Sequence, residues 1–496
     1  GLLQIVNEML AGDISHLNAQ RRFFHYLHPR GIKEMAESRG LRIAYAVIHL
    51  LESLEGGEVE NRLCALRALR DEVMCSDNRE LLINTARVLL EIMKELVRAH
   101  GNYARQLQLA HDFRVAASGK SRIVRGYLNK YHLLEMPEEW NQLAFDDHVH
   151  DASTKGRKSA THLIMDAWIK GIRRLRVIYY NFIRPETAEE LIEAAGIMGI
   201  LVRIGIEFPV SFYGRYVQLI WVPRGFADAD DFIRFLSKSP VENLMNDGGE
   251  VSDYQRNYVL AILDQFNRKH RHTINDKFDI HLPALDVGEF LSFVGIGQAS
   301  LLHLAKFIHA KLLPLMSAKV AALRRRFPNA ETAEQQRITE LVNEMDQLDL
   351  QAIHDAYLKA DKNPDVPDIK RADIGDPPAL MQLSPAELIG HLGRLHLGYR
   401  ITLNLSNVGP EDVLELLYDC HGMITRLEIF NLKDYADGKV EHVPAIHDLQ
   451  RCINSGNVIK LKRIILEMID RLEKQDDPVS RERARKLKKI LATIES

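Results

Sequence analysis

The sequence predicts an α/β protein in which a barrel-type domain follows an N-terminal helical bundle and is extended by helical insertions. Two observations support this prediction. In residues 1–135 apolar side chains recur at every third and fourth position, which is the period of helices that bury one face. From about Trp140 the pattern changes, and short β-rich runs alternate with helical stretches, as in β-α units with parallel strands.

The elements after Trp140 follow one another in a clear order. The first stretches are LAFDDHV, a helix near 159–170, LRVIYY, a helix near 186–196, ILVRIGIE and YVQLIWV. After a loop at 223–225 the helical period returns and continues to about residue 360. The run 361–378 contains Pro and Asp residues that cannot continue a helix, so it is predicted to be a linker. Two further strand-like runs, YRITLNLSN and ITRLEIFN, flank the helix PEDVLELLYDC, and a charged helical tail begins near residue 445.

These changes in pattern divide the chain into five predicted segments. They are a helical bundle (1–135), the first part of the α/β barrel-type domain (136–255), a helical insertion with a linker (256–378), the second part of the α/β domain (379–440) and a helical tail (441–496). A chain of 496 residues is too long for one ordinary core, which agrees with more than one domain.

The composition argues against several classes of partner. Apolar residues make up 46% of the chain and charged residues 27%, but the formal net charge is only −3. No overall charge therefore attracts nucleic acid or an acidic membrane, and we expect neither as a partner. The four cysteines (Cys64, Cys75, Cys420, Cys452) form no C-x-x-C pair, no apolar run reaches about 18 residues, and the first residues lack signal-peptide features. The sequence predicts a cytoplasmic protein and indicates no oligomeric state.

A candidate metal site lies at the ends of two predicted strands. His148 and His150 are two residues apart, so on a strand their side chains share one face and could chelate one metal ion. Glu207 ends the run ILVRIGIE and could join them at the carboxyl end of a barrel, where barrel sites are built. The alternatives are histidines hydrogen-bonded to their neighbours and a carboxylate paired with a nearby Arg or Lys.

The order of these features resembles the PHP (polymerase and histidinol phosphatase) family of metal-dependent phosphoesterases. The family's first motif, H-x-H-T-x-x-S-D-G, is similar to the segment from His148 to Gly156, HVHDASTKG. Its Gly-x-Glu motif matches Gly205 to Glu207. The helix GQASLLHLAKFIH and the strand LEIFN are similar to later parts of the family pattern. This resemblance covers about residues 141–435 and implies a PHP-like barrel-type domain that holds divalent metal.

The chain departs from the family at several ligand positions. Lys155 stands where the family has a metal-binding Asp, and Tyr179 and Tyr180 stand where it has an Asp-His pair. The resemblance therefore implies a reduced site with zero or one divalent ion, of zinc, manganese or iron, held by His148, His150 and Glu207. Lys155, Tyr179 and Tyr180 would then contact the substrate, although a solvated loop lysine is the simpler interpretation of Lys155.

Two functions follow from this pattern. The first is a PHP-like hydrolase with a reduced metal site, which acts on a phosphoester or another anionic small molecule. The second is a catalytically inactive barrel that serves as an interaction or regulatory scaffold. The sequence assigns no catalytic residue. If the barrel prediction is right, His148, Asn181, Glu207 and Asn431 lie near one rim, because each ends a strand-like run.

Overall fold

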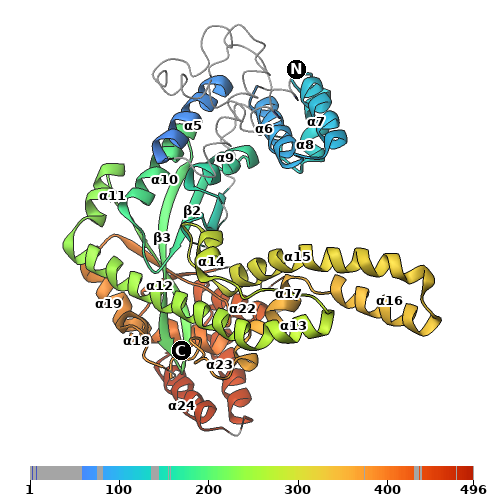
Figure 1. Ribbon diagram of the computed structural model, residues 1–496. Coiled ribbons are helices and arrows are strands. Elements are labelled where there is room, and N and C mark those ends of the chain that lie inside the picture. The colour runs from blue at the N-terminus through green and yellow to red at the C-terminus, as the bar shows by residue number, and fades with distance from the viewer. Residues whose placement is uncertain are drawn as a thin grey trace. The chain divides into compact units, whose positions relative to one another are not determined.

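The structure is a computed structural model of the 496-residue chain. It describes residues 58–74, 82–135, 145–154, 158–373, 375–428, 440–475 and 477–494, with the single residues 3, 7, 156, 435 and 438. Figure 1 labels elements of the chain, which divides into two compact units. Unit 1 comprises Gly1–Ile178, Arg184–Ile204 and Asp228–Arg234, and unit 2 comprises Tyr179–Ile183, Gly205–Ala227 and Phe235–Ser496.

The described residues of unit 1 are mostly helical. Its elements are α5 (Val59–Met74), α6 (Leu82–Arg98), α7 (Tyr103–Ala116), α8 (Ser121–Lys130), β1 (Phe145–Val149), α9 (Ala160–Lys170), most of β2 (Arg174–Tyr180), α10 (Pro185–Met198), the start of β3 (Leu201–Phe212) and most of α11 (Ala229–Leu236). The helical period predicted for residues 1–135 is confirmed in α5 to α8. Because these helices share unit 1 with β1, α9 and α10, their independence as a domain stays a prediction.

The helices beside β1 begin and end where the sequence contains capping residues. Ser159 accepts a hydrogen bond from the His162 amide at the start of α9, and Gly171 ends that helix with φ 80°. Pro185 opens α10, and Gly199 closes it. These signals explain why the helices predicted near 159–170 and 186–196 are confirmed almost to the residue.

Unit 2 contains most of the sheet and a large set of helices. Its remaining elements are β4 (Arg215–Pro223), α12 (Ser239–Gln265), a π-helical turn (Phe266–His270), α13 (Arg271–Phe278), α14 (Val287–Val294), α15 (Leu301–Arg326), α16 (Thr332–Asp346), α17 (Leu350–Ile353), a second π-helical turn (His354–Leu358), α18 (Ala379–Gln382), α19 (Pro385–Leu395), β5 (Tyr399–Leu403), α20 (Pro410–Asp419), β6 (Ile424–Leu427), α22 (Val443–Asn454), α23 (Val458–Glu473) and α24 (Pro478–Thr493). Among the described helices, none is both long enough and apolar enough to cross a bilayer.

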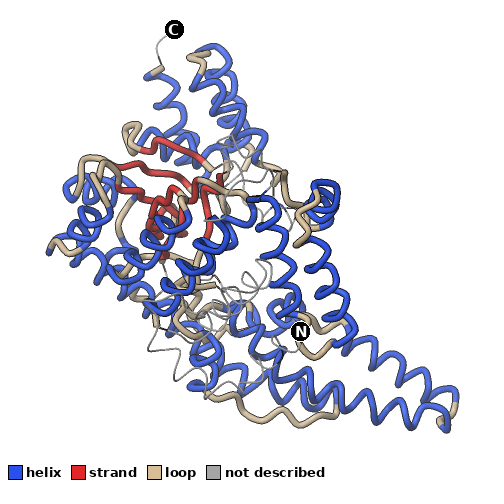
Figure 2. Tube along the Cα trace, turned by 90° about the horizontal axis from the view of Figure 1, so that it is seen from above, coloured by secondary structure: helices blue, strands red, loops and turns tan. Residues whose placement is uncertain are grey.

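The six strands found among the described residues form one sheet in the order β1-β2-β3-β4-β5-β6, and strands are drawn in red in Figure 2. The pair β1–β2 is parallel, as predicted, and β5–β6 is parallel too, but β3–β4 and β4–β5 are antiparallel. The expectation of parallel strands throughout is therefore wrong at β4. Only Tyr213 and Gly214 separate β3 from β4, and both have positive φ (48° and 72°), as a tight hairpin turn requires. A parallel crossover needs about a dozen residues, so it cannot form here.

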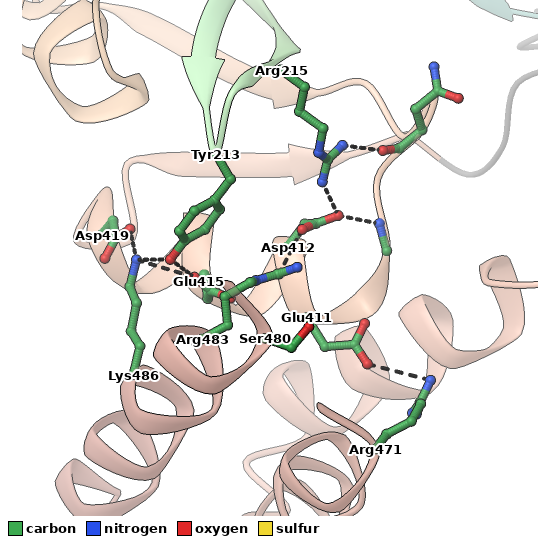
Figure 3. A network of polar contacts seen from close by, with 12 residues as sticks. Tyr213, Arg215, Glu411, Asp412, Glu415, Asp419, Arg471, Ser480, Arg483 and Lys486 are labelled. Carbon is green, nitrogen blue, oxygen red and sulfur yellow. Dashed lines mark hydrogen bonds and ion pairs between the residues drawn. The ribbon is translucent and has the colours of Figure 1, made fainter. Parts of the chain in front are cut away.

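An ion-pair network joins the β3–β4 turn to the C-terminal helices of unit 2 (Figure 3). Arg483 of α24 donates to Asp412 at 2.7 Å and to Glu415 at 2.8 Å, and Glu415 is fully buried. Tyr213 also donates to Glu415, at 2.6 Å, and Arg215 pairs with Asp412 at 2.5 Å. The turn, α20 and α24 are thereby held together by charges that are largely withdrawn from water.

We expect Arg483→Met to reduce the free energy of unfolding by about 3 kcal/mol, because it leaves buried carboxylates short of a cation. Arg485→Met is the matched control, since Arg485 is exposed on the same helix and its loss should change stability by about 0.5 kcal/mol or less. Thermal and urea unfolding of both variants would check this. Equal losses in the two variants would contradict the role of the network.

Helix α12 approaches the end of β2 closely in unit 2. Gly248 lies against the carbonyl oxygen of Asn181, and a Cβ at this position would come within 3.0 Å of that backbone atom. The adjacent Gly249 has open space where its Cβ would be. Asn181 itself has φ 65°, and its side-chain amide donates to Ser252 at 3.0 Å, so the turn after β2 is fixed to α12.

The two glycines therefore give a matched pair of substitutions. Gly248→Ala should destabilise the protein by about 1–3 kcal/mol, because backbone must move to admit the methyl group. Gly249→Ala should stabilise it by about 0.5–1 kcal/mol, through helix propensity alone. Thermal unfolding of the two variants decides between this account and one in which both glycines act only through helix propensity, which predicts a gain in both.

Candidate functional site

The predicted histidine pair is formed in unit 1. His148 lies in β1 and His150 follows it, and their Nε2 atoms are 3.1 Å apart. The two rings meet edge to face, with centroids separated by 4.9 Å. Nδ1 of His150 is 2.8 Å from the carbonyl oxygen of Ile178, which can only accept, so this nitrogen carries the proton and donates. The proton-free lone pair of His150 is therefore on Nε2, which faces His148.

This geometry suits two chemical states. Two nitrogens bound to one tetrahedral metal ion at 2.0–2.1 Å lie about 3.3 Å apart, close to the separation observed. The same separation suits a hydrogen bond from one ring to the other when no ion is present. A donation from the second ring nitrogen to a backbone carbonyl is also the arrangement that orients metal-binding histidines in proteins.

The loop after His150 is tightly folded. Asp151 is buried, its carboxylate accepts a hydrogen bond from the Ser153 amide at 2.8 Å, and its carbonyl accepts one from the Gly156 amide at 2.8 Å. A Cβ on Gly156 would come within 3.0 Å of the carbonyl oxygens of both His150 and Asp151. The loop can thus close on the histidine only with glycine at this position. Lys155 lies outside the described residues.

Glu207 lies in unit 2, where its side chain is 2% exposed. Oε1 accepts a hydrogen bond from the side-chain amide of Asn404 at 2.7 Å. Burial, together with the negative charges of Glu207 and Glu428, raises the pKa of the Tyr180 phenol far above its usual value. Tyr180 is therefore a neutral hydrogen-bond donor at physiological pH, whereas Tyr179 is almost completely buried.

The strand registers place further polar residues on the face that carries Glu207. Glu207 pairs with Ile220, Ile220 with Thr402, and Thr402 with Arg426, so all four side chains lie on one face of the sheet. Two residues further along, Asn404 and Glu428 lie on the same side. Arg400, two residues before Thr402, also lies on this side, and we call Glu207, Arg400, Thr402, Asn404, Arg426 and Glu428 the polar face. Sequence analysis missed all of these residues except Glu207, although in both RITLN and RLE polar residues alternate with apolar ones, the signal of a two-sided strand.

The predicted site residues are therefore only partly brought together. The structure joins His148 to His150 in unit 1 and groups Tyr180 with Glu207 in unit 2. A metal shared by the histidine pair and Glu207 stays a prediction. Across the described part of the chain, no group of three or more His, Cys, Asp and Glu side chains is arranged to hold a metal ion. Asn181 follows the end of β2, and its backbone N–H donates to the backbone carbonyl oxygen of Glu207. Asn431 lies outside the described residues.

Gly156→Ala should displace His150 and lower the free energy of unfolding by about 1–3 kcal/mol, because its methyl group meets two carbonyl oxygens. Gly126→Ala, in α8, serves as the control, since a Cβ there meets nothing and helix propensity should add a little stability. Thermal unfolding gives the stabilities, and histidine NMR signals report the position of the pair. Unchanged histidine signals in Gly156→Ala would show that the loop does not hold the ring.

Comparisons with known proteins give little further guidance. No protein-family model and no curated protein matches the chain. A protein provisionally described as a metal-dependent phosphoesterase, from Bifidobacterium adolescentis, aligns with a TM-score of 0.34 and 13% identity over 60% of this chain and 78% of that one. An amidohydrolase from Chromobacterium violaceum, whose structure holds sulfate and no metal, aligns with a TM-score of 0.35 and 14% identity over 62% and 83%. Likenesses of this size do not establish a family for the chain.

Proposed function

We propose that this protein is a metal-dependent hydrolase of PHP-like barrel type that binds a single divalent ion through His148 and His150 and acts on a phosphoester. The observation that carries the proposal is the pair of Nε2 atoms 3.1 Å apart, with the proton of His150 held on Nδ1 by the Ile178 carbonyl. Imidazole ligands suit zinc and iron, and a carboxylate ligand suits manganese. Glu207 is the proposed third ligand.

The chain's own residues would bind and orient the reactants. His150 needs no rotation to present its lone pair, since the hydrogen bond to Ile178 fixes the ring. A neutral Tyr180 can donate to an oxygen of an anionic substrate without adding charge repulsion. We retain Lys155 and Tyr179 as proposed substrate contacts. When bound, a divalent ion supplies Lewis acidity and neutralises charge on the phosphoester.

His148→Ala and His150→Ala should each weaken metal binding by about 100-fold or more, because the remaining ligands hold a divalent ion poorly against water. His111→Ala is the control, since His111 is exposed on helix α7 and should leave binding unchanged. Elemental analysis of protein purified without chelator, followed by calorimetric titration with Zn²⁺ and Mn²⁺, measures the effect. The wild type should contain at most one tightly bound ion per chain.

A panel of simple phosphoesters, assayed with and without added metal, tests the reaction itself. We expect weak turnover that disappears in His148→Ala and survives in His111→Ala, because one ion cannot clamp both the attacking and the leaving oxygen. Two or three ions at full occupancy would show that the reduced-site interpretation is wrong. Metal binding without any turnover would instead favour the inactive scaffold.

A further inference from the structure

The hydroxyl of Thr402 is a buried polar group without a partner. Thr402 is 3% exposed, and its Oγ1 makes no hydrogen bond with any described part of the chain. A buried hydroxyl in this state costs free energy, so native structures nearly always provide such a group with a hydrogen-bond partner. Its position on β5 places it on the polar face, between Ile220 of β4 and Arg426 of β6.

Charged residues of both signs surround Thr402 on the polar face. Arg426 lies directly opposite it on the neighbouring strand, which puts the two backbones roughly 5 Å apart. Arg400 precedes it by two residues on the same face, roughly 7 Å along β5. Glu207 is two strands away, roughly 10 Å, and its charge is already engaged by the Asn404 amide. Glu428 lies two residues beyond Arg426, just after β6, roughly 7–8 Å from Thr402, so the nearest charged residue to the hydroxyl is Arg426.

We propose that the polar face binds a phosphate-type oxyanion, to which the Thr402 hydroxyl donates and for which Arg400 and Arg426 supply positive charge. Planar guanidinium groups match phosphate oxygens well, and a hydroxyl adds a short, oriented donor. Phosphate, as the class of ligand, rests on the proposed function. The position of the subsite follows from the strand registers and from the hydroxyl that has no hydrogen-bond partner. Thr402 is thereby a substrate-contacting residue.

Thr402→Val tests this directly, because valine has nearly the same shape and lacks only the hydroxyl. In the full-length protein without ligand, the variant should melt about 1–2 °C higher than wild type, since an unsatisfied polar group is removed. Its affinity for inorganic phosphate, measured by calorimetry and by the phosphate-induced rise in melting temperature, should fall about tenfold. Thr402→Ser keeps the hydroxyl and should retain the wild-type affinity.

The matched control is Thr425→Val on β6. Thr425 is exposed, and its hydroxyl donates to the Ile401 carbonyl at 3.3 Å, so this variant should melt slightly lower and bind phosphate as wild type does. Wild-type protein that does not bind phosphate, or Thr402→Val protein that binds it as tightly as wild type, would overturn the inference. Phosphate binding that depends on Thr402 without any phosphoester turnover would support the subsite and refute the proposed hydrolase. If the protein hydrolyses phosphoesters and Thr402→Val binds phosphate as tightly as wild type, only the proposed subsite is refuted, and the proposed hydrolase stands.

Discussion

The hydrogen bond between the Asn404 amide and the Glu207 carboxylate is the contact around which the polar face is organised. Glu207 is 2% exposed, so its carboxylate needs a hydrogen-bond donor within reach, because burying an unpaired charge costs roughly several kcal/mol. Asn404 supplies that donor at 2.7 Å and so ties the end of β5 to β3. The side-chain Oδ1 of Asn404 accepts a hydrogen bond from the backbone N–H of Ser406 at 2.9 Å, which fixes the orientation of the side chain.

The loop that carries Asn404 is held in turn by the ion-pair network of Figure 3. Arg215 donates to the carbonyl of Asn407, and Asp412 accepts from the Gly409 amide at 2.7 Å. Arg483 closes the network from α24. Helix α24 therefore supports the polar face indirectly, through Asp412 and the loop that carries Asn404, although it supplies no residue to that face.

The histidine pair depends on a different and more local constraint. His148 and His150 come from one strand end, and the ring of His150 is oriented by a backbone carbonyl of the neighbouring strand β2. The tight turn through Gly156 brings the following loop back against the same backbone. These contacts lie within unit 1, whereas those of Glu207 and Asn404 lie within unit 2. The histidine pair and Glu207 are thus each positioned by contacts within their own unit.

The sequence by itself determined the positions of the six described strands and of the helices α9, α10 and α20, and placed His148 and His150 on one face, because these depend on local periodicity, on capping residues and on a spacing of two along a strand. It did not determine strand direction at β4, since the hairpin relies on Tyr213 adopting a positive φ that few such residues take. Nor did it reveal that Thr402 lies opposite Arg426, or that Asn404 reaches Glu207. Alternation along a strand says which residues share a face, but which strands become neighbours is decided only when the whole sheet packs.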